Sequence, residues 1–291
     1  MYDILRNSQP ERQKLRAWLY SALIVIYATF FMVSGNSGDA DASLILNMDP
    51  MLLLVVQGVV STLMFIVFSL LFIRYVLKLS ISEFFPTVNW IQAGMLILIT
   101  ISFMVVNSAV GEWNMSVNFP DSDFENWARK SEDQLKVLTE HITNFQTFGH
   151  FFVAFIVVAI IPAIGEELLF RGLLQNFLGK AFSNPHIAIW VSGFIFAAIH
   201  MQFYGVVPRM LLGVLFGYLY FWSGKLSTAM IAHLINNGFA LILLYLAKTE
   251  IIEATPEQME SSAPWPAVLV FGIIFIASLK MFYSKFSKTD E

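Results

Sequence analysis

Long apolar segments constrain this chain more than any other feature of its sequence. A membrane-spanning helix needs about 20 predominantly apolar residues. Eight segments reach or approach that length: about 17–34, 50–77, 89–110, 147–165, 185–203, 206–223, 226–247 and 264–284. Hydrophobic residues make up 57% of the chain and charged residues 13%, against roughly 45–50% and about 25% in soluble domains. The sequence therefore predicts an all-α, polytopic membrane helical bundle of about eight transmembrane helices.

One long polar connection, about 111–146, predicts an amphipathic interfacial helix. Its apolar residues recur mostly three or four positions apart, with charged residues between them: Phe124, Trp127, Leu135, Leu138, Ile142 and Phe145. Such a helix lies along the membrane surface with its apolar face inward. A packed connector and a gate for substrate fit this pattern equally well.

The distribution of charge predicts an orientation in the membrane. With the N-terminus in the cytoplasm, twelve of the 17 Lys and Arg residues fall on the inner side and five on the outer side, as the positive-inside rule requires. We therefore expect an integral protein of a bacterial-type inner membrane with both termini cytoplasmic. The net charge of -4 provides no basic field for nucleic acid. The chain has no Cys, so a cysteine nucleophile and thiolate metal ligands are excluded.

Three segments carry polar side chains where the apolar pattern predicts none. They are 165–172 (GEELLFRG), 196–200 (FAAIH) and 233–237 (HLINN). An ionisable group at membrane depth costs roughly 2.5–3.5 kcal/mol or more, so it persists mainly where it is paired or functional. Each residue alone could have a structural explanation, but the set on three helices favours a functional site.

Helical spacing divides the charged residues of the first segment. Glu167 and Arg171 are four residues apart and share a helix face, which predicts an ion pair that holds the helix in position. Glu166 points about 100° around the same helix. Its carboxylate stays free, which makes Glu166 the better candidate for a general base.

The other two segments supply further candidates. His233 and Asn237 share one helix face and could donate hydrogen bonds to an oxyanion, whereas Asn236 points elsewhere. His200 follows Phe196 by one turn, and the Phe196 ring could wall a dry pocket beside it. A glutamate with His200 could bind and deprotonate a water, and these groups together supply what amide hydrolysis needs.

A covalent route has less support in the sequence. Three serines near the polar segments, Ser192, Ser223 and Ser227, show no Gly-x-Ser-x-Gly context. A metal-dependent route stays open, because Glu166, His200 and His233 are competent ligands for a divalent metal such as zinc. The sequence contains no His-Glu-x-x-His motif.

The three motifs resemble a known signature. Glu-Glu-x-x-x-Arg at 166–171, Phe-x-x-x-His at 196–200 and His-x-x-x-Asn at 233–237 are similar to the signature of the CPBP intramembrane proteases. This family includes the type II CAAX prenyl endopeptidases and bacterial relatives linked to bacteriocin processing and immunity. The resemblance covers roughly 145–247. It implies that Glu166 and His200 activate water, and that His233 and Asn237 form the oxyanion hole.

The resemblance also suggests how the chain is organised. We expect N-terminal transmembrane helices and the interfacial helix in 1–144, a CPBP-like catalytic helix core in 145–250, and a C-terminal transmembrane helix in 251–291. The expected function is hydrolysis of a peptide bond in a membrane-associated protein or peptide, with a prenylated CAAX-type protein as one candidate. The alternative is a non-catalytic membrane scaffold or bacteriocin-immunity protein.

A simple topology creates one conflict among the site residues. It places Glu166 and His233 toward the inner half of the membrane but His200 toward the outer end of its span. Either the helix before His200 starts deeper than Asn184 and Pro185 suggest, or the helix that carries Glu166 is long and tilted. We expect the second arrangement.

Overall fold

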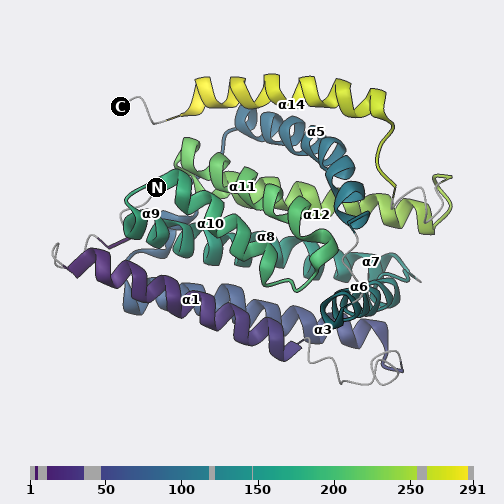
Figure 1. Cartoon of the computed structure of the whole chain (residues 1–291), viewed down its shortest axis with the longest axis horizontal. Helices are drawn as coiled ribbons and strands as arrows, with labels where there is room; N and C mark the ends of the chain where they lie inside the picture. Colours follow the sequence, from purple (N-terminus) through teal and green to yellow (C-terminus); the bar gives the residue numbers. More distant parts are fainter. Residues whose placement is uncertain are drawn as a thin grey trace.

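The structure is a computed structural model that describes residues 4–5, 12–35, 47–117, 122–145, 147–253 and 261–287. All regular elements in these ranges are helices (Figure 1). Six helices are long and apolar enough to cross a membrane: Pro50–Val76, Trp90–Met115, Phe148–Phe182, Phe203–Ser223, Leu226–Lys248 and Trp265–Phe286. The predicted all-α membrane bundle is confirmed.

The predicted count of eight spans is too high for the part of the chain that the structure describes. The expected span at 185–203 forms the shorter helix α10 (Pro185–Ala198). The expected span at 17–34 falls on α1 (Gln13–Gly35), whose side chains after position 29 lie outside the described residues. Within the described residues, six of the eight predicted segments therefore correspond to helices that are both long and apolar enough to span a membrane.

The bundle places its central helices between two outer groups (Figure 1). On one side, α14 (Trp265–Phe286) packs on α5 (Trp90–Met115). The opposite side is formed by α1 and α3 (Pro50–Ser61). Between them lie the helix of residues 148–182, α10, α11 (Val206–Ser223) and α12 (Leu226–Lys248). The three polar motifs are all on these central helices.

The helix of residues 148–182 is interrupted by wider, π-helical turns. It runs through α7 (Phe148–Ala154), α8 (Ile161–Glu167) and α9 (Asn176–Phe182), with π-helical stretches at Phe155–Ile160 and Leu168–Gln175. Pro162 follows the first stretch and has no N–H to donate, so the helix must adjust locally. Glu166 and Glu167 lie in the short α-helical section between the two wide stretches.

The length of this helix resolves the expected conflict in depth. Glu166 precedes the helix end at Phe182 by 16 residues, and His200 follows the start of α10 at Pro185 by 15 residues. The two residues therefore lie a similar number of residues from the short loop that joins the two helices. The N-cap of α10 is Asn184, whose side chain accepts hydrogen bonds from the backbone of His186 and Ile187, so α10 does not start deeper.

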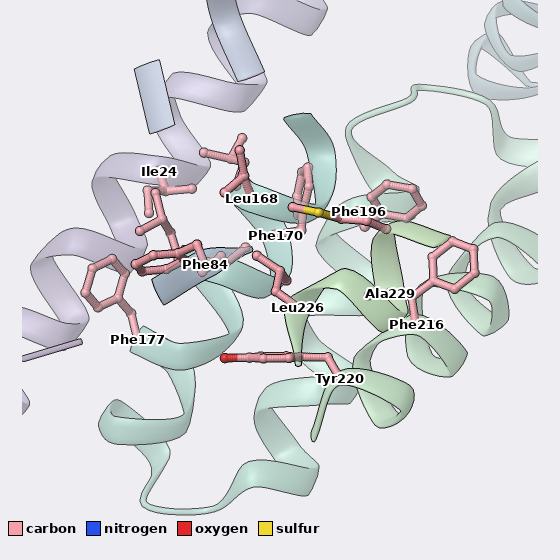
Figure 2. Packing of buried hydrophobic residues seen from close by; sticks show 14 of the residues in the cluster. Ile24, Phe84, Leu168, Phe170, Phe177, Phe196, Phe216, Tyr220, Leu226 and Ala229 are labelled. Carbon is pink, nitrogen blue, oxygen red and sulfur yellow. The ribbon is translucent and has the colours of Figure 1, made fainter. Parts of the chain in front are cut away.

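Small residues allow α10 and α11 to pack closely. A Cβ atom added to Gly193 would lie 2.8 Å from Val214 Cγ2, and one added to Gly213 would lie 3.1 Å from the Gly193 Cα. Close backbone approach of this kind is the usual role of small residues between membrane helices. Large aromatic side chains fill the adjoining core, including Phe170, Phe196 and Phe216 (Figure 2).

The predicted interfacial helix is present as α6 (Asp123–Ile142). At its N-terminal end the side chains of Phe124 and Trp127 are exposed on the surface of the bundle. Glu125, between them in sequence, is buried, and its Oε2 accepts a 2.6 Å hydrogen bond from the Tyr204 hydroxyl. This contact connects α6 to the turn that precedes α11.

Candidate active site

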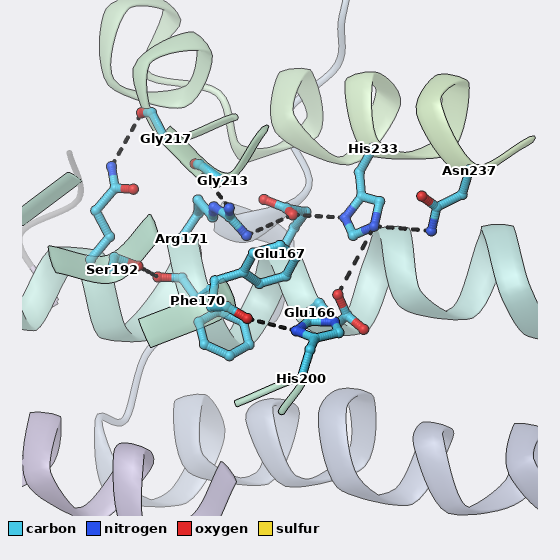
Figure 3. Close-up of polar contacts among 12 residues, drawn as sticks. Glu166, Glu167, Phe170, Arg171, Ser192, His200, Gly213, Gly217, His233 and Asn237 are labelled. Atoms are coloured by element: carbon cyan, nitrogen blue, oxygen red, sulfur yellow. Dashed lines mark hydrogen bonds and ion pairs between the residues drawn. The ribbon is translucent and has the colours of Figure 1, made fainter. Parts of the chain in front are cut away.

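Glu167 lies at the centre of a buried polar network (Figure 3). Its Oε1 atom is 2.8 Å from Arg171 Nη1 and 2.8 Å from His233 Nδ1. Glu167 and Arg171 are both 0% exposed. The predicted ion pair is therefore present, and it includes a histidine from α12 that helical spacing alone did not assign to it.

Arg171 makes further contacts that fix its guanidinium group. Its Nη2 donates to the Gly213 carbonyl at 2.9 Å. The guanidinium carbon lies 4.7 Å from the Phe196 ring centroid and 5.6 Å from that of Phe216, within the range of cation–π attraction. A buried charge needs this degree of pairing, because removal of one partner leaves the other uncompensated.

The contacts of His233 determine which ring nitrogen faces the rest of the site. Because a carboxylate oxygen can only accept, Nδ1 carries the hydrogen that is donated to Glu167. The other nitrogen, Nε2, lies 3.2 Å from Asn237 Nδ2 and 4.0 Å from Glu166 Oε2. The ring also stacks on Phe216 with centroids 5.1 Å apart. His233 is thus held on one side and presents Nε2 on the other.

The side-chain amide group of Asn237 is hydrogen-bonded to other groups of the protein. Its Nδ2 donates to the Val158 carbonyl at 3.1 Å and to His233 Nε2 at 3.2 Å, and its Oδ1 accepts from Asn236 at 3.0 Å. Both amide hydrogens are therefore engaged. Asn237 orients the ring of His233, in addition to any role as a donor to a reacting group.

Glu166 differs from its neighbour Glu167 in its contacts. Its carboxylate makes no hydrogen bond to another described side chain, and His233 Nε2, 4.0 Å from its Oε2, is beyond hydrogen-bond distance. The residue is only 9% exposed. The two adjacent glutamates are thus divided as their helical positions predict, one bound and one free.

His200 joins the cluster through Phe196. It lies in the turn that follows α10, where its Nδ1 donates to the Phe196 carbonyl at 2.6 Å. The Phe196 ring centroid is 5.0 Å from that of His200 and 6.2 Å from that of His233, so this ring does form a wall beside His200. Across the described ranges, no hydrogen bond or ion pair joins His200 to Glu166, and their joint action on water stays a prediction.

The geometry does not support the alternative metal site at Glu166, His200 and His233. No group of three or more His, Asp or Glu side chains suited to hold a metal ion occurs within the residues that the structure describes. We therefore derive no step of the chemistry through a metal.

Sequence reasoning missed several contributors to the site. The Phe216 ring and the Gly213 carbonyl come from α11, and the Val158 carbonyl comes from a π-helical stretch. Apolar side chains and backbone carbonyls in apolar helices carry no polar signal in a sequence. Only the glycine spacing at Gly213 and Gly217 marked the part of α11 that approaches the site.

The segment that contains this cluster is similar to a known protein family. Residues 148–239 match the family described as type II CAAX prenyl endopeptidase Rce1-like. The resemblance of this segment to the CPBP proteases is thereby confirmed. The matched segment contains all six predicted site residues: Glu166, Glu167, Arg171, His200, His233 and Asn237.

Individual relatives are bacterial membrane or uncharacterized proteins. The membrane-embedded CAAX protease MroQ of Staphylococcus aureus (strain USA300) is 31% identical over 106 residues, which are 35% of this chain and 42% of MroQ. The uncharacterized protein YpbD of Bacillus subtilis (strain 168) is 33% identical over 87 residues, 28% of this chain and 41% of YpbD. The chain therefore spans less than half the length of these curated relatives. No solved structure matches it.

Proposed function

We propose that this chain is an intramembrane endopeptidase that hydrolyses a peptide bond of a membrane-associated protein or peptide with a water activated by Glu166. The observation that carries the proposal is the division between the two glutamates. Glu167 is bound to Arg171 and His233, whereas the Glu166 carboxylate has no hydrogen-bond partner among the described residues and faces His233 Nε2 at 4.0 Å. The similarity of residues 148–239 to a protease family supports the same conclusion.

The distance between Glu166 and His233 suits a water-activation step. A water molecule about 2.8 Å from each atom can contact both groups across the 4.0 Å separation. Glu166 takes a proton from this water, and the resulting hydroxide attacks the carbonyl carbon of the substrate. Glu166 then returns the proton to the leaving amine as the C–N bond breaks. We assign His200 to help hold this water molecule, as the family resemblance implies.

His233 and Asn237 are assigned to the oxyanion. When Nε2 of His233 carries a proton, it stops accepting from Asn237, and both groups can donate to the developing negative charge. Glu167 accepts from Nδ1 on the far side of the ring, which stabilises the protonated ring and keeps it oriented. Arg171 fixes Glu167 in turn.

The substrate class follows from the setting of the site. Except for His200, its residues lie on helices of membrane-spanning character, so a substrate must be held at the membrane. One relative is named a CAAX protease, which makes a prenylated C-terminal segment one candidate. An unmodified hydrophobic peptide is the other.

Comparative membrane proteomics tests the proposal. Cells that express the wild type, the Glu166→Ala variant or no protein are compared for peptide fragments in the membrane fraction. We expect a set of fragments that occurs only with the wild type, while the Glu166→Ala protein accumulates to the same level. Identical fragments with the Glu166→Ala variant would contradict the assignment of the base.

A non-catalytic scaffold or immunity protein is the second candidate function. The buried network of Glu167, Arg171 and His233 favours it, because that network joins two helices whether or not a reaction occurs. In this case the cellular phenotype survives Glu166→Ala and is lost with Glu167→Ala. The protease proposal predicts loss of the phenotype with both variants.

A further inference from the structure

A second polar cluster lies beside the site, and Gln202 is its centre. Arg209 Nη2 donates to Gln202 Oε1 at 2.5 Å, and Gln202 Nε2 donates to Glu132 Oε1 at 3.3 Å. The carbonyl and N–H of one amide are therefore bound between a guanidinium and a carboxylate. These three residues come from α11, from the turn before it and from α6.

The same two charged groups each keep one atom without a partner. Glu132 Oε2 and Arg209 Nη1 are buried and make no hydrogen bond. One of them is an acceptor and the other a donor. Buried polar atoms are normally hydrogen-bonded, and a single orphan already calls for an explanation. Here the two orphans have the complementary polarity that a second amide group would satisfy.

The position of the cluster connects it to the chemistry. Gln202 is two residues after His200, and the charge of Arg209 acts electrostatically on Glu132, Glu166 and His200. The cluster thus lies within electrostatic range of the proposed base.

Local structure holds the two charged groups near each other. A Cβ atom on Gly205 would lie 3.2 Å from both Nη atoms of Arg209, so the absence of a side chain at Gly205 gives the guanidinium its place. On the other side, Glu125 of α6 accepts from Tyr204 at 2.6 Å, which keeps α6 and its Glu132 against this turn. The cluster is therefore a built feature of the fold.

We propose that Glu132 and Arg209 bind a backbone amide of the peptide substrate beside the Gln202 amide, with the substrate carbonyl on Arg209 Nη1 and its N–H on Glu132 Oε2. This inference rests on the proposed function, because it takes the substrate to be a peptide. Recognition of backbone atoms tolerates many side chains, so the clamp positions a chain next to His200 without selecting its sequence.

A binding measurement with two simple probes tests the clamp. The probes are a fluorescein-labelled, C-terminally amidated decapeptide of alternating Ala and Leu, and the same peptide with its backbone nitrogens methylated, which removes the N–H groups. Fluorescence anisotropy with the full chain in detergent gives both dissociation constants, for the wild type, Glu132→Gln and Arg209→Lys. The matched control is Glu140→Gln, an exposed carboxylate on the same helix.

The wild type and the Glu140→Gln control should bind the unmethylated probe about tenfold more tightly than the methylated one, as loss of one hydrogen bond to a charged group predicts. Glu132→Gln should bind both probes with similar, weaker affinity, and Arg209→Lys should weaken both. Equal binding of the two probes by the wild type overturns the clamp, and so does an unchanged preference in Glu132→Gln.

Cleavage of the unmethylated probe, followed in the same samples by mass spectrometry, separates this inference from the proposed function. A binding preference without cleavage supports the clamp and counts against the protease. Cleavage without a preference overturns the clamp and leaves the protease standing. The two-probe comparison on the wild type needs no variant to fold, so equal binding of the two probes overturns the clamp whatever the variants do.

Discussion

His233 Nδ1 lies 2.8 Å from Glu167 Oε1, and the same oxygen accepts a hydrogen bond from Arg171. One carboxylate oxygen therefore joins α12 to the helix of residues 148–182 and fixes the orientation of an imidazole ring. The neighbouring Glu166 makes no comparable bond and lies on the Nε2 side of that ring. The proposed chemistry of the site depends on this difference between two adjacent glutamates.

Replacement of the bound glutamate should destabilise the protein. Glu167→Gln leaves the fully buried Arg171 without a charge partner, and broken buried pairs cost about 3–5 kcal/mol. Unfolding in detergent with increasing denaturant measures the loss. The matched control is Glu140→Gln on the exposed side of α6, which should leave the unfolding free energy unchanged. A Glu167→Gln protein as stable as the wild type contradicts the central role of this carboxylate.

The proposed oxyanion donor should affect the rate more than substrate binding. Asn237→Ala should lower kcat about 100-fold and change KM little, as loss of one such donor does in other hydrolases. Asn236→Ala is the matched control, because its amide reaches only Asn237 Oδ1 and its loss should cost a few-fold at most. Steady-state kinetics on a cleaved peptide gives both constants. Equal effects of the two variants would show that Asn237 acts only by positioning.

The close approach of α10 and α11 should tolerate no added side chain at Gly213. A Cβ there meets Arg171 Nη2 and the Gly193 Cα at 3.1 Å, so Gly213→Ala should cost about 1–3 kcal/mol of stability. Gly94→Ala is the control, since a Cβ at Gly94 has no atom within 4 Å. Its stability should stay the same or rise by up to about 1 kcal/mol. Thermal unfolding gives the melting temperature of each variant. Equal melting temperatures would contradict the close packing of α10 and α11 at Gly213.

The pH dependence of stability should report on Glu132. Burial raises the pKa of its carboxyl, against the charge of Arg209 and the hydrogen bond from Gln202, while Asp133 adds to the rise. The folded protein therefore binds this proton more tightly than the unfolded chain does. Stability should fall as pH increases from the ordinary carboxyl range through the raised pKa.

Glu132→Gln should remove this part of the pH dependence, because glutamine does not titrate. Its unfolding free energy should vary less with pH over the same window than that of the wild type. Denaturant unfolding at a series of pH values measures both slopes. A slope in Glu132→Gln equal to that of the wild type would show that another group is responsible.

Helical periodicity was sufficient to predict the parts of the site that lie on one helix. The pair of Glu167 and Arg171 and the common face of His233 and Asn237 follow from a four-residue spacing, and both are present. The bond between Glu167 and His233 joins different helices. No spacing rule within a helix can predict it, because it depends on the distance and rotation between the helices.

The fold shows the same division between local and long-range information. Apolar length predicted the six long helices, but α10 ends at Ala198, short of the predicted end at 203. Apolar composition continues past that point, while the backbone turns at His200 and Met201, where Met201 has a positive φ of 55°. The bond between Glu125 of α6 and the distant Tyr204 is likewise long-range, so the spacing of apolar residues in α6 does not predict it.

The most direct test of the account compares Glu166→Gln with the wild type in one assay. Both purified proteins are incubated with the peptide that the membrane proteomics identifies, product formation is followed by mass spectrometry, and denaturant unfolding is measured on the same preparations. We expect Glu166→Gln to unfold like the wild type and to form no product, because the carboxylate that accepts the water proton is gone. Product formation by a folded Glu166→Gln protein at the wild-type rate would contradict it.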